Sequence, residues 1–121
     1  MIVDNPDESV YRRGRVSKVN INRNPTSRDF KPRSQDEGKL SVNLKSLSTA
    51  IISVVDINRF NLFELKITDI NDIRNDQGVN LFVEEDPIED NLSHALINRI
   101  EPEDDETPLK LAEIAINATP E

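Results

Sequence analysis

The chain has 121 residues, of which 36 % are apolar and 31 % are charged, and its formal net charge is −8. This length and composition predict one domain with a small apolar core. The absence of cysteine excludes disulfides and thiolate ligands or nucleophiles, and the negative net charge argues against general binding to nucleic acid or anionic membranes.

We expect residues 1–9, which are polar and acidic, to be a disordered tail. A single domain is predicted over residues 10–118, followed by a frayed end at residues 119–121. Within this domain, loose apolar alternation predicts a strand over residues 16–21, and Gly14 is expected to mark a turn or bulge before that strand.

Residues 22–38 are rich in asparagine, proline and serine, which favour a loop. We expect Phe30, the one large apolar side chain of this loop, to pin it to the core. Residues 39–44 alternate between apolar and polar side chains, so a half-buried strand is predicted there, with its apolar face made by Leu40, Val42 and Leu44.

Residues 46–58 give a mixed signal. The apolar residues from Leu47 to Val55 are spaced as on a helix, whereas the many β-branched side chains among them favour a strand. We favour a helix that ends near Val55, and a strand is the alternative.

Three further strands are predicted over residues 60–67, 79–83 and 95–100. A short helix is expected over residues 68–74 with Thr68 as its N-cap, and a last helix is expected to begin with Thr107 as its N-cap. The acidic runs at residues 84–90 and 101–106 are expected to be a solvated loop and a linker. Strands and short helices that interleave without long crossovers predict an α+β fold with a small, mostly antiparallel sheet and a C-terminal helix.

The charges divide along the chain. Between Tyr11 and Lys45, ten arginines and lysines stand against three acids, whereas the remainder is acidic. We expect folding to place these groups as two separate patches of opposite sign, and such patches select the partners that a protein meets.

His94 is the single histidine, and an imidazole that titrates near neutral pH is a candidate general base. Ser93 adjoins it, but neighbours along an extended chain point to opposite faces, so these two residues are not expected to form a catalytic pair. The alternative, which we favour, is a histidine at the start of a strand that bonds to loop backbone.

The basic loop offers a candidate anion site, since arginine and lysine suit phosphate and carboxylate groups. Its residues are Arg28, Lys31, Arg33 and Lys39. The alternative, which we favour, is a basic loop tied to the protein's own acidic loops. No glycine-rich phosphate loop occurs in the sequence.

We predict no cofactor and no metal site. A calcium-loop frame that would use Asn75 and Glu84 places Ile73, which cannot ligate, at its first position. The last helix carries an apolar stripe, which either docks in the groove of a partner or packs on the protein's own sheet. No stretch approaches the roughly 20 apolar residues of a membrane span, and residues 1–6 lack a secretory pattern, so a cytoplasmic location is expected.

Four short sequences follow one another along the chain: FKPR at residues 30–33, DEGKLSV at 36–42, SHALI at 93–97 and KLAEIA at 110–115. In this order they resemble a group of small uncharacterised bacterial proteins. The resemblance implies a bacterial, cytoplasmic, single-domain protein, and it brings no activity or catalytic residue.

These observations are compatible with three candidate functions. The first is a non-enzymatic protein-binding role, as an adaptor, immunity or accessory protein whose acidic surface attracts a basic partner. The second is a small enzyme in which Arg28, Lys31 and Arg33 hold a phosphate-bearing substrate and His94 is the base. The third and weakest is nucleic-acid binding by the basic third of the chain. The oligomeric state is left open.

Overall fold

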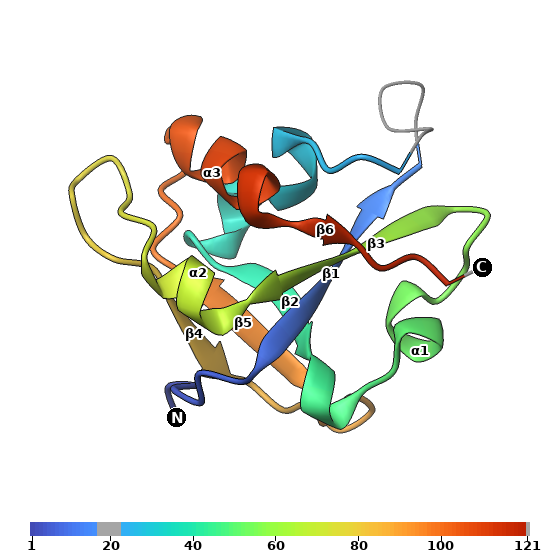
Figure 1. The fold of residues 1–121 in the computed structure, drawn as a ribbon. Helices are drawn as coiled ribbons and strands as arrows, with labels where there is room; N and C mark the ends of the chain where they lie inside the picture. The colour runs from blue at the N-terminus through green and yellow to red at the C-terminus, as the bar shows by residue number, and fades with distance from the viewer. Residues whose placement is uncertain (17–22, 121) are drawn as a thin grey trace.

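The computed structural model describes residues 1–16 and 23–120. Over these residues, six strands form one antiparallel sheet in the order β4-β5-β2-β1-β3-β6 (Figure 1). The strands are β1 (Ser9–Arg15), β2 (Leu40–Leu44), β3 (Phe60–Lys66), β4 (Phe82–Glu85), β5 (His94–Asn98) and β6 (Ile116–Asn117). The helices are α1 (Ala50–Val54), α2 (Ile67–Asn71) and α3 (Glu106–Ile114), with 3-10 turns at Ser27–Phe30, Ser34–Asp36 and Lys45–Leu47. The predicted α+β fold is confirmed.

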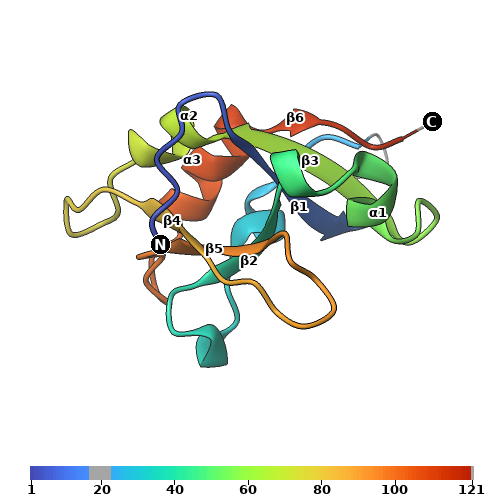
Figure 2. The same cartoon turned by 90° about the horizontal axis from the view of Figure 1, so that it is seen from below.

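The sheet has two unlike faces, because alternate residues of a strand point in opposite directions. On one face, Val10 and Phe63 belong to the main apolar core, to which α2 and α3 contribute buried side chains. On the other face, Tyr11 and Leu62 pack with Val54 of α1 in a small second cluster. Figure 2 shows α2 and α3 together and α1 apart from them. We call these the core face and the second face.

The core face holds the loop that precedes β2. Phe30 has no exposed surface, and its ring centroid lies 6.0 Å from that of Phe63, which confirms that Phe30 pins this loop to the core. The side chains of Leu40, Val42 and Leu44 are buried on the same face, as the alternation predicts. The last helix packs on the protein's own core through buried residues of α3.

Gly14 lies inside β1, opposite Asn61 of β3, and not at a turn or bulge before a strand. A Cβ atom on Gly14 would lie 2.9 Å from the ring of Phe63 and closer still to the carboxylate of Asp29. Glycine is therefore needed here for a close approach to the core, a use of this residue that local sequence does not distinguish from a turn.

The segment expected as an acidic tail, residues 1–9, instead lies against the sheet. Val3 is buried, and its backbone N–H donates a hydrogen bond of 2.8 Å to the carbonyl oxygen of Val83 in β4. Glu8 is buried as well, and its carboxylate accepts hydrogen bonds from the backbone and side chain of Ser46. The boundary predicted at residue 10 falls inside β1, because composition does not show which carboxylates find donors within the protein.

Some boundaries differ from the prediction. The strand expected over residues 16–21 lies outside the described residues except for Val16, which follows the end of β1. Thr68 is inside α2 and does not cap it, since the N-cap position is Lys66. Within the described chain, no helix has the length and apolar character needed to span a bilayer.

Helix α3 begins at Glu106 and takes its N-terminal hydrogen bonds from the run expected to be a linker. The buried carboxylate of Asp104 accepts hydrogen bonds from the backbone N–H groups of Glu106 and Thr107, at 3.0 and 2.9 Å, and from the hydroxyl of Thr107. It also accepts one from the backbone N–H of Asp76, at 3.0 Å. Burial by itself raises the pKa of Asp104, but these four hydrogen bonds outweigh it and hold the pKa below its ordinary value.

Candidate functional site

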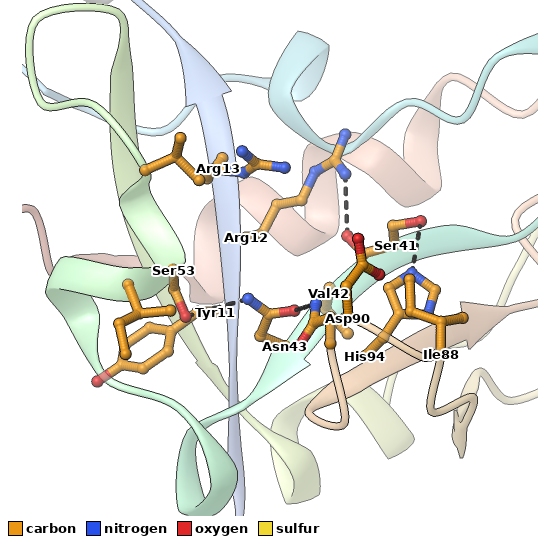
Figure 3. A pocket seen from close by; sticks show the side chains of 13 residues that line it. Tyr11, Arg12, Arg13, Ser41, Val42, Asn43, Ser53, Ile88, Asp90 and His94 are labelled. Carbon is orange, nitrogen blue, oxygen red and sulfur yellow. Dashed lines mark hydrogen bonds between the residues drawn. The ribbon is translucent and has the colours of Figure 1, made fainter.

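The second face contains a pocket of about 390 Å³, bounded by β1, β2, the start of β5, α1 and the loop that joins β4 to β5 (Figure 3). Its floor carries polar side chains from the strands, including Ser41, Asn43 and His94. Apolar side chains from α1 and the loop stand around it. The sequence pattern does not reveal this pocket, because its residues come from four separate segments.

His94 occupies the first position of β5 and connects the loop to β2. Its Nδ1 lies 3.0 Å from the backbone oxygen of Asp86 and 3.1 Å from the carboxylate oxygen Oδ2 of the same residue. Its Nε2 lies 3.2 Å from Oγ of Ser41. Because Nδ1 faces two acceptors, it carries the proton of the neutral imidazole, and Nε2 then accepts the hydroxyl proton of Ser41.

The contact between His94 and loop backbone is therefore present, as the favoured alternative predicted. The pairing of β2 with β5 explains the second contact. Asn43 lies opposite His94 in this antiparallel pair, and Ser41 is two residues along β2 on the same face. Ser41 and His94 are 53 residues apart in sequence. Only the register of the two strands brings them together, so the sequence analysis missed Ser41.

Arg12 fills the gap where β1 and β2 separate. The two strands pair over two residue pairs only, and beyond them the Arg12 guanidinium supplies donors in place of the ladder. Its Nε donates to the backbone oxygen of Asp29 at 2.8 Å, and Nη1 donates to the backbone oxygen of Ser41 at 2.9 Å. Burial, together with the neighbouring charge of Arg13, lowers the pKa of Arg12 to about 10.

Arg13 is the second cation that lines the pocket. It is exposed, and its guanidinium carbon lies 5.1 Å from the ring centroid of Phe60. Asp90, from the β4–β5 loop, is the acid among the lining side chains. The pocket thus has two neighbouring guanidinium groups on one part of its wall and one carboxylate on another.

The basic residues expected to bind an anion, namely Arg28, Lys31, Arg33 and Lys39, do not line this pocket. Lys31 forms an ion pair with Asp105. Arg33 pairs with Asp36 at 3.2 Å, and the hydrogen bond from Arg33 lowers the pKa of Asp36. The structure therefore does not bring these cations to His94.

Several cations of the basic third contact the protein's own acids. Besides Lys31 and Arg33, Lys45 pairs with Glu64 at 3.1 Å, which raises the pKa of Lys45. The acids involved come both from neighbouring residues and from distant segments. The expected separation into two patches of opposite sign stays a prediction.

Helix α1 confirms the prediction of a helix but buries little of its apolar surface. Ile51, Ile52 and Val55 are 74 %, 69 % and 65 % exposed, while Val54 is buried. Val55 has a φ of 68° and a ψ of −56°, and the N–H of Asp56 donates to the oxygen of Val54 at 2.8 Å. This is a γ-turn of the strained kind, which is rare for a β-branched residue.

The loop between β4 and β5 faces α1 across the pocket. Ile88, which is 45 % exposed, and Asp90 both line the pocket beside Ile52 and Val55. Glu89 and Asp90 are exposed and make no ion pair within the described residues. Apolar and acidic side chains thus alternate around one opening.

Comparisons with protein-family models, curated proteins and solved structures found no match for this chain. The resemblance to small bacterial proteins therefore stays a prediction. In residues 1–16 and 23–120, no group of three or more histidine, cysteine, aspartate and glutamate side chains is arranged to hold a metal ion.

Proposed function

We propose that this protein binds a basic protein partner through the opening of the second-face pocket, as an adaptor, immunity or accessory protein in the cytoplasm. The binding surface is called the rim, and it consists of Ile52, Val55, Ile88 and Asp90, which line the pocket, with their chain neighbours Ile51 and Glu89. One observation carries the proposal. Exposed apolar side chains from two distant segments, α1 with its C-cap and the β4–β5 loop, border the same pocket, and the acids beside them make no ion pair within the described residues.

The apolar part of the rim supplies the main argument. Large aliphatic side chains grouped on the surface of a monomer mark interaction sites more often than isolated ones do. Burying them in an interface removes apolar area from water, which favours association by about 25 cal/mol per Å² before the costs of binding. Of α1, Val54 and Ala50 pack in the second cluster, whereas Ile51 and Ile52 do not belong to it.

The acidic part of the rim supplies the choice of partner. Exposed charges at the edge of an interface accelerate encounter with a partner of opposite sign and disfavour partners of the same sign. Glu89 and Asp90 are exposed and make no ion pair within the described residues, in contrast to the cations of the basic third, several of which pair internally. A partner with basic side chains around apolar anchors fits this arrangement.

The other two functions receive less support. An enzyme that uses Arg28, Lys31 and Arg33 with His94 needs these groups in one cavity, and none of the three cations lines the pocket of His94. Nucleic-acid binding by the basic third needs cations directed to solvent, yet Lys31, Arg33 and Lys45 contact acids of the protein.

The test is affinity capture from a native bacterial lysate at increasing salt, with identification of the captured protein. Two rim variants are compared with the unaltered chain, Ile52→Ser with Val55→Ser, and Glu89→Gln with Asp90→Asn. We expect the captured protein to be basic in composition. Both variants should weaken its retention at least about tenfold, and retention should fall as salt rises.

Matched controls exist on other surfaces. Leu109→Ser changes an exposed aliphatic residue of α3. Replacing the exposed acids Glu103 and Glu113 by their amides removes the same number of charges as the acidic rim variant. Equal retention by rim variants and controls would contradict the proposal, as would capture that does not depend on salt.

A further inference from the structure

We propose that Ser41 is a nucleophile, activated by His94 with Asp86 as the orienting group, and that the pocket cleaves small esters that carry an anionic group. This activity goes beyond partner binding and uses the floor of the pocket, whereas the binding proposal uses its rim.

Three groups in hydrogen-bonding distance of one another carry the proposal. Ser41 Oγ lies 3.2 Å from His94 Nε2, and His94 Nδ1 lies 3.1 Å from Asp86 Oδ2. This is the order of nucleophile, base and orienting carboxylate that acyl-transfer sites on unrelated folds share. The imidazole is 17 % exposed and is held from both sides, while Ser41 is exposed toward the pocket.

The tautomer of His94 follows from its neighbours. The backbone oxygen and the carboxylate of Asp86 both accept, so the ring proton stays on Nδ1 and the lone pair of Nε2 is directed at Ser41. A histidine that only capped a loop would need the contact at Nδ1 and no more. The second contact places a base beside an accessible hydroxyl, as Figure 3 shows.

The cations of the pocket indicate the substrate class. Arg12 donates to the backbone oxygen of Ser41, so its positive charge lies next to the residue that would attack the ester. Arg13 lines the same pocket and offers a second positive charge. A bound anion relieves the repulsion between the two guanidinium groups, whereas the carboxylate of Asp90 disfavours an anion on its side. A volume of about 390 Å³ suits a small molecule.

The reaction balances with water as the second reactant. Ser41 Oγ bonds to the ester carbonyl carbon while its proton moves to His94 Nε2, and the bond to the leaving oxygen then breaks as that oxygen takes the proton. Water next attacks the acyl–Ser41 ester, gives its proton to Nε2, and Ser41 recovers a proton as the acid leaves. The products are one carboxylic acid and one alcohol, and nothing is oxidised or reduced.

The first experiment measures covalent labelling of the full chain by a fluorophosphonate probe, with the modified residue located by peptide mass spectrometry. We expect one adduct, on Ser41. His94→Gln should slow labelling about 100-fold or more, since a general base contributes roughly 10²–10⁴-fold, and Ser41→Ala should abolish it. Ser34→Ala, which changes an exposed serine outside the pocket, should label at the unaltered rate.

The second experiment tests the substrate class with two 4-nitrophenyl esters, the neutral acetate and the anionic hemisuccinate. The unaltered chain should favour the anionic ester, and Arg13→Gln should reduce that preference. Circular dichroism and thermal unfolding check that each variant is folded. If the folded, unaltered chain gives no adduct, or gives one that persists in Ser41→Ala, the nucleophile proposal is overturned. Equal rates for the two esters overturn the anionic class.

Discussion

The two faces of the sheet are built from the same strands but differ in what they exclude. On the core face, Val10, Phe63 and Ile97 have no exposed surface and exclude water completely. On the second face, residues of the same strands with the opposite parity include exposed Arg13 and half-buried His94. One face supplies stability, and the other, supported by it, holds polar groups in fixed positions. Both faces arise because successive side chains of a strand point to opposite sides of the sheet.

Carboxylates in the two regions also differ in their exposure and in their partners. Asp104, at the N-terminus of α3, is buried and receives four hydrogen bonds from the protein. Asp90, beside the pocket, is exposed and has no ion-pair partner within the described part of the chain. A carboxylate that is fully bonded internally stabilises the fold, whereas one that faces solvent is available to a ligand or a partner.

Phe63→Ala should give the largest effect, because it removes a fully buried ring at the centre of the core face. Deleting such a ring costs about 3–5 kcal/mol in free energy of unfolding. Urea denaturation followed by circular dichroism measures this loss. A cost below about 1 kcal/mol would show that the core face is not the source of stability.

Asp104→Asn should cost less, about 1–2 kcal/mol at neutral pH, because it weakens the hydrogen bonds that cap α3. The folded-state pKa of Asp104 is depressed, so its contribution is fully present above the unfolded value of about 3.9. The contribution disappears as the pH falls through the lower folded value. Unfolding at pH 7 and at acidic pH should therefore show a difference between variant and unaltered chain that shrinks with acidification. A difference that is constant with pH would contradict the assignment.

Val55→Gly should give the smallest effect and the opposite sign. Relief of a strained backbone conformation is worth about 1–3 kcal/mol, and the added freedom of glycine in the unfolded chain offsets about 0.5–1 kcal/mol of it. We expect a net gain in stability of about 1 kcal/mol or less by thermal unfolding. Ile51→Ser, an exposed change nearby, should stay within about 0.5 kcal/mol. A marked loss of stability in Val55→Gly would mean that the valine side chain supports the fold.

The local sequence pattern predicted the structure correctly where apolar and polar side chains alternate regularly along a strand that packs on the core. The strand at β2 and the burial of Phe30 follow from apolar spacing and from the rarity of large apolar side chains in a polar loop. The prediction from composition was wrong for residues 1–9. Val3 is buried and the carboxylate of Glu8 accepts hydrogen bonds, so this segment lies against the sheet despite its acidic composition. The prediction was also wrong for Gly14, whose role depends on Phe63, a residue on another strand.

For the candidate site, sequence singled out His94 because the chain has one histidine, and it correctly expected a contact with loop backbone. It paired His94 with the wrong cations, since Arg12 and Arg13 line the pocket while the more conspicuous basic loop does not. Ser41 carried no local sign of a role. Its relation to His94 exists only in the register between β2 and β5.

The sequence by itself determined the class of fold, most of the strands and the absence of cysteine chemistry, because these depend on composition and on short-range periodicity. Only the tertiary structure decided which charges neutralise one another, which glycine touches the core and which serine meets the histidine. Those outcomes depend on contacts between residues far apart in the chain, and Coulomb and hydrogen-bond energies act over a few ångströms in space whatever the separation in sequence.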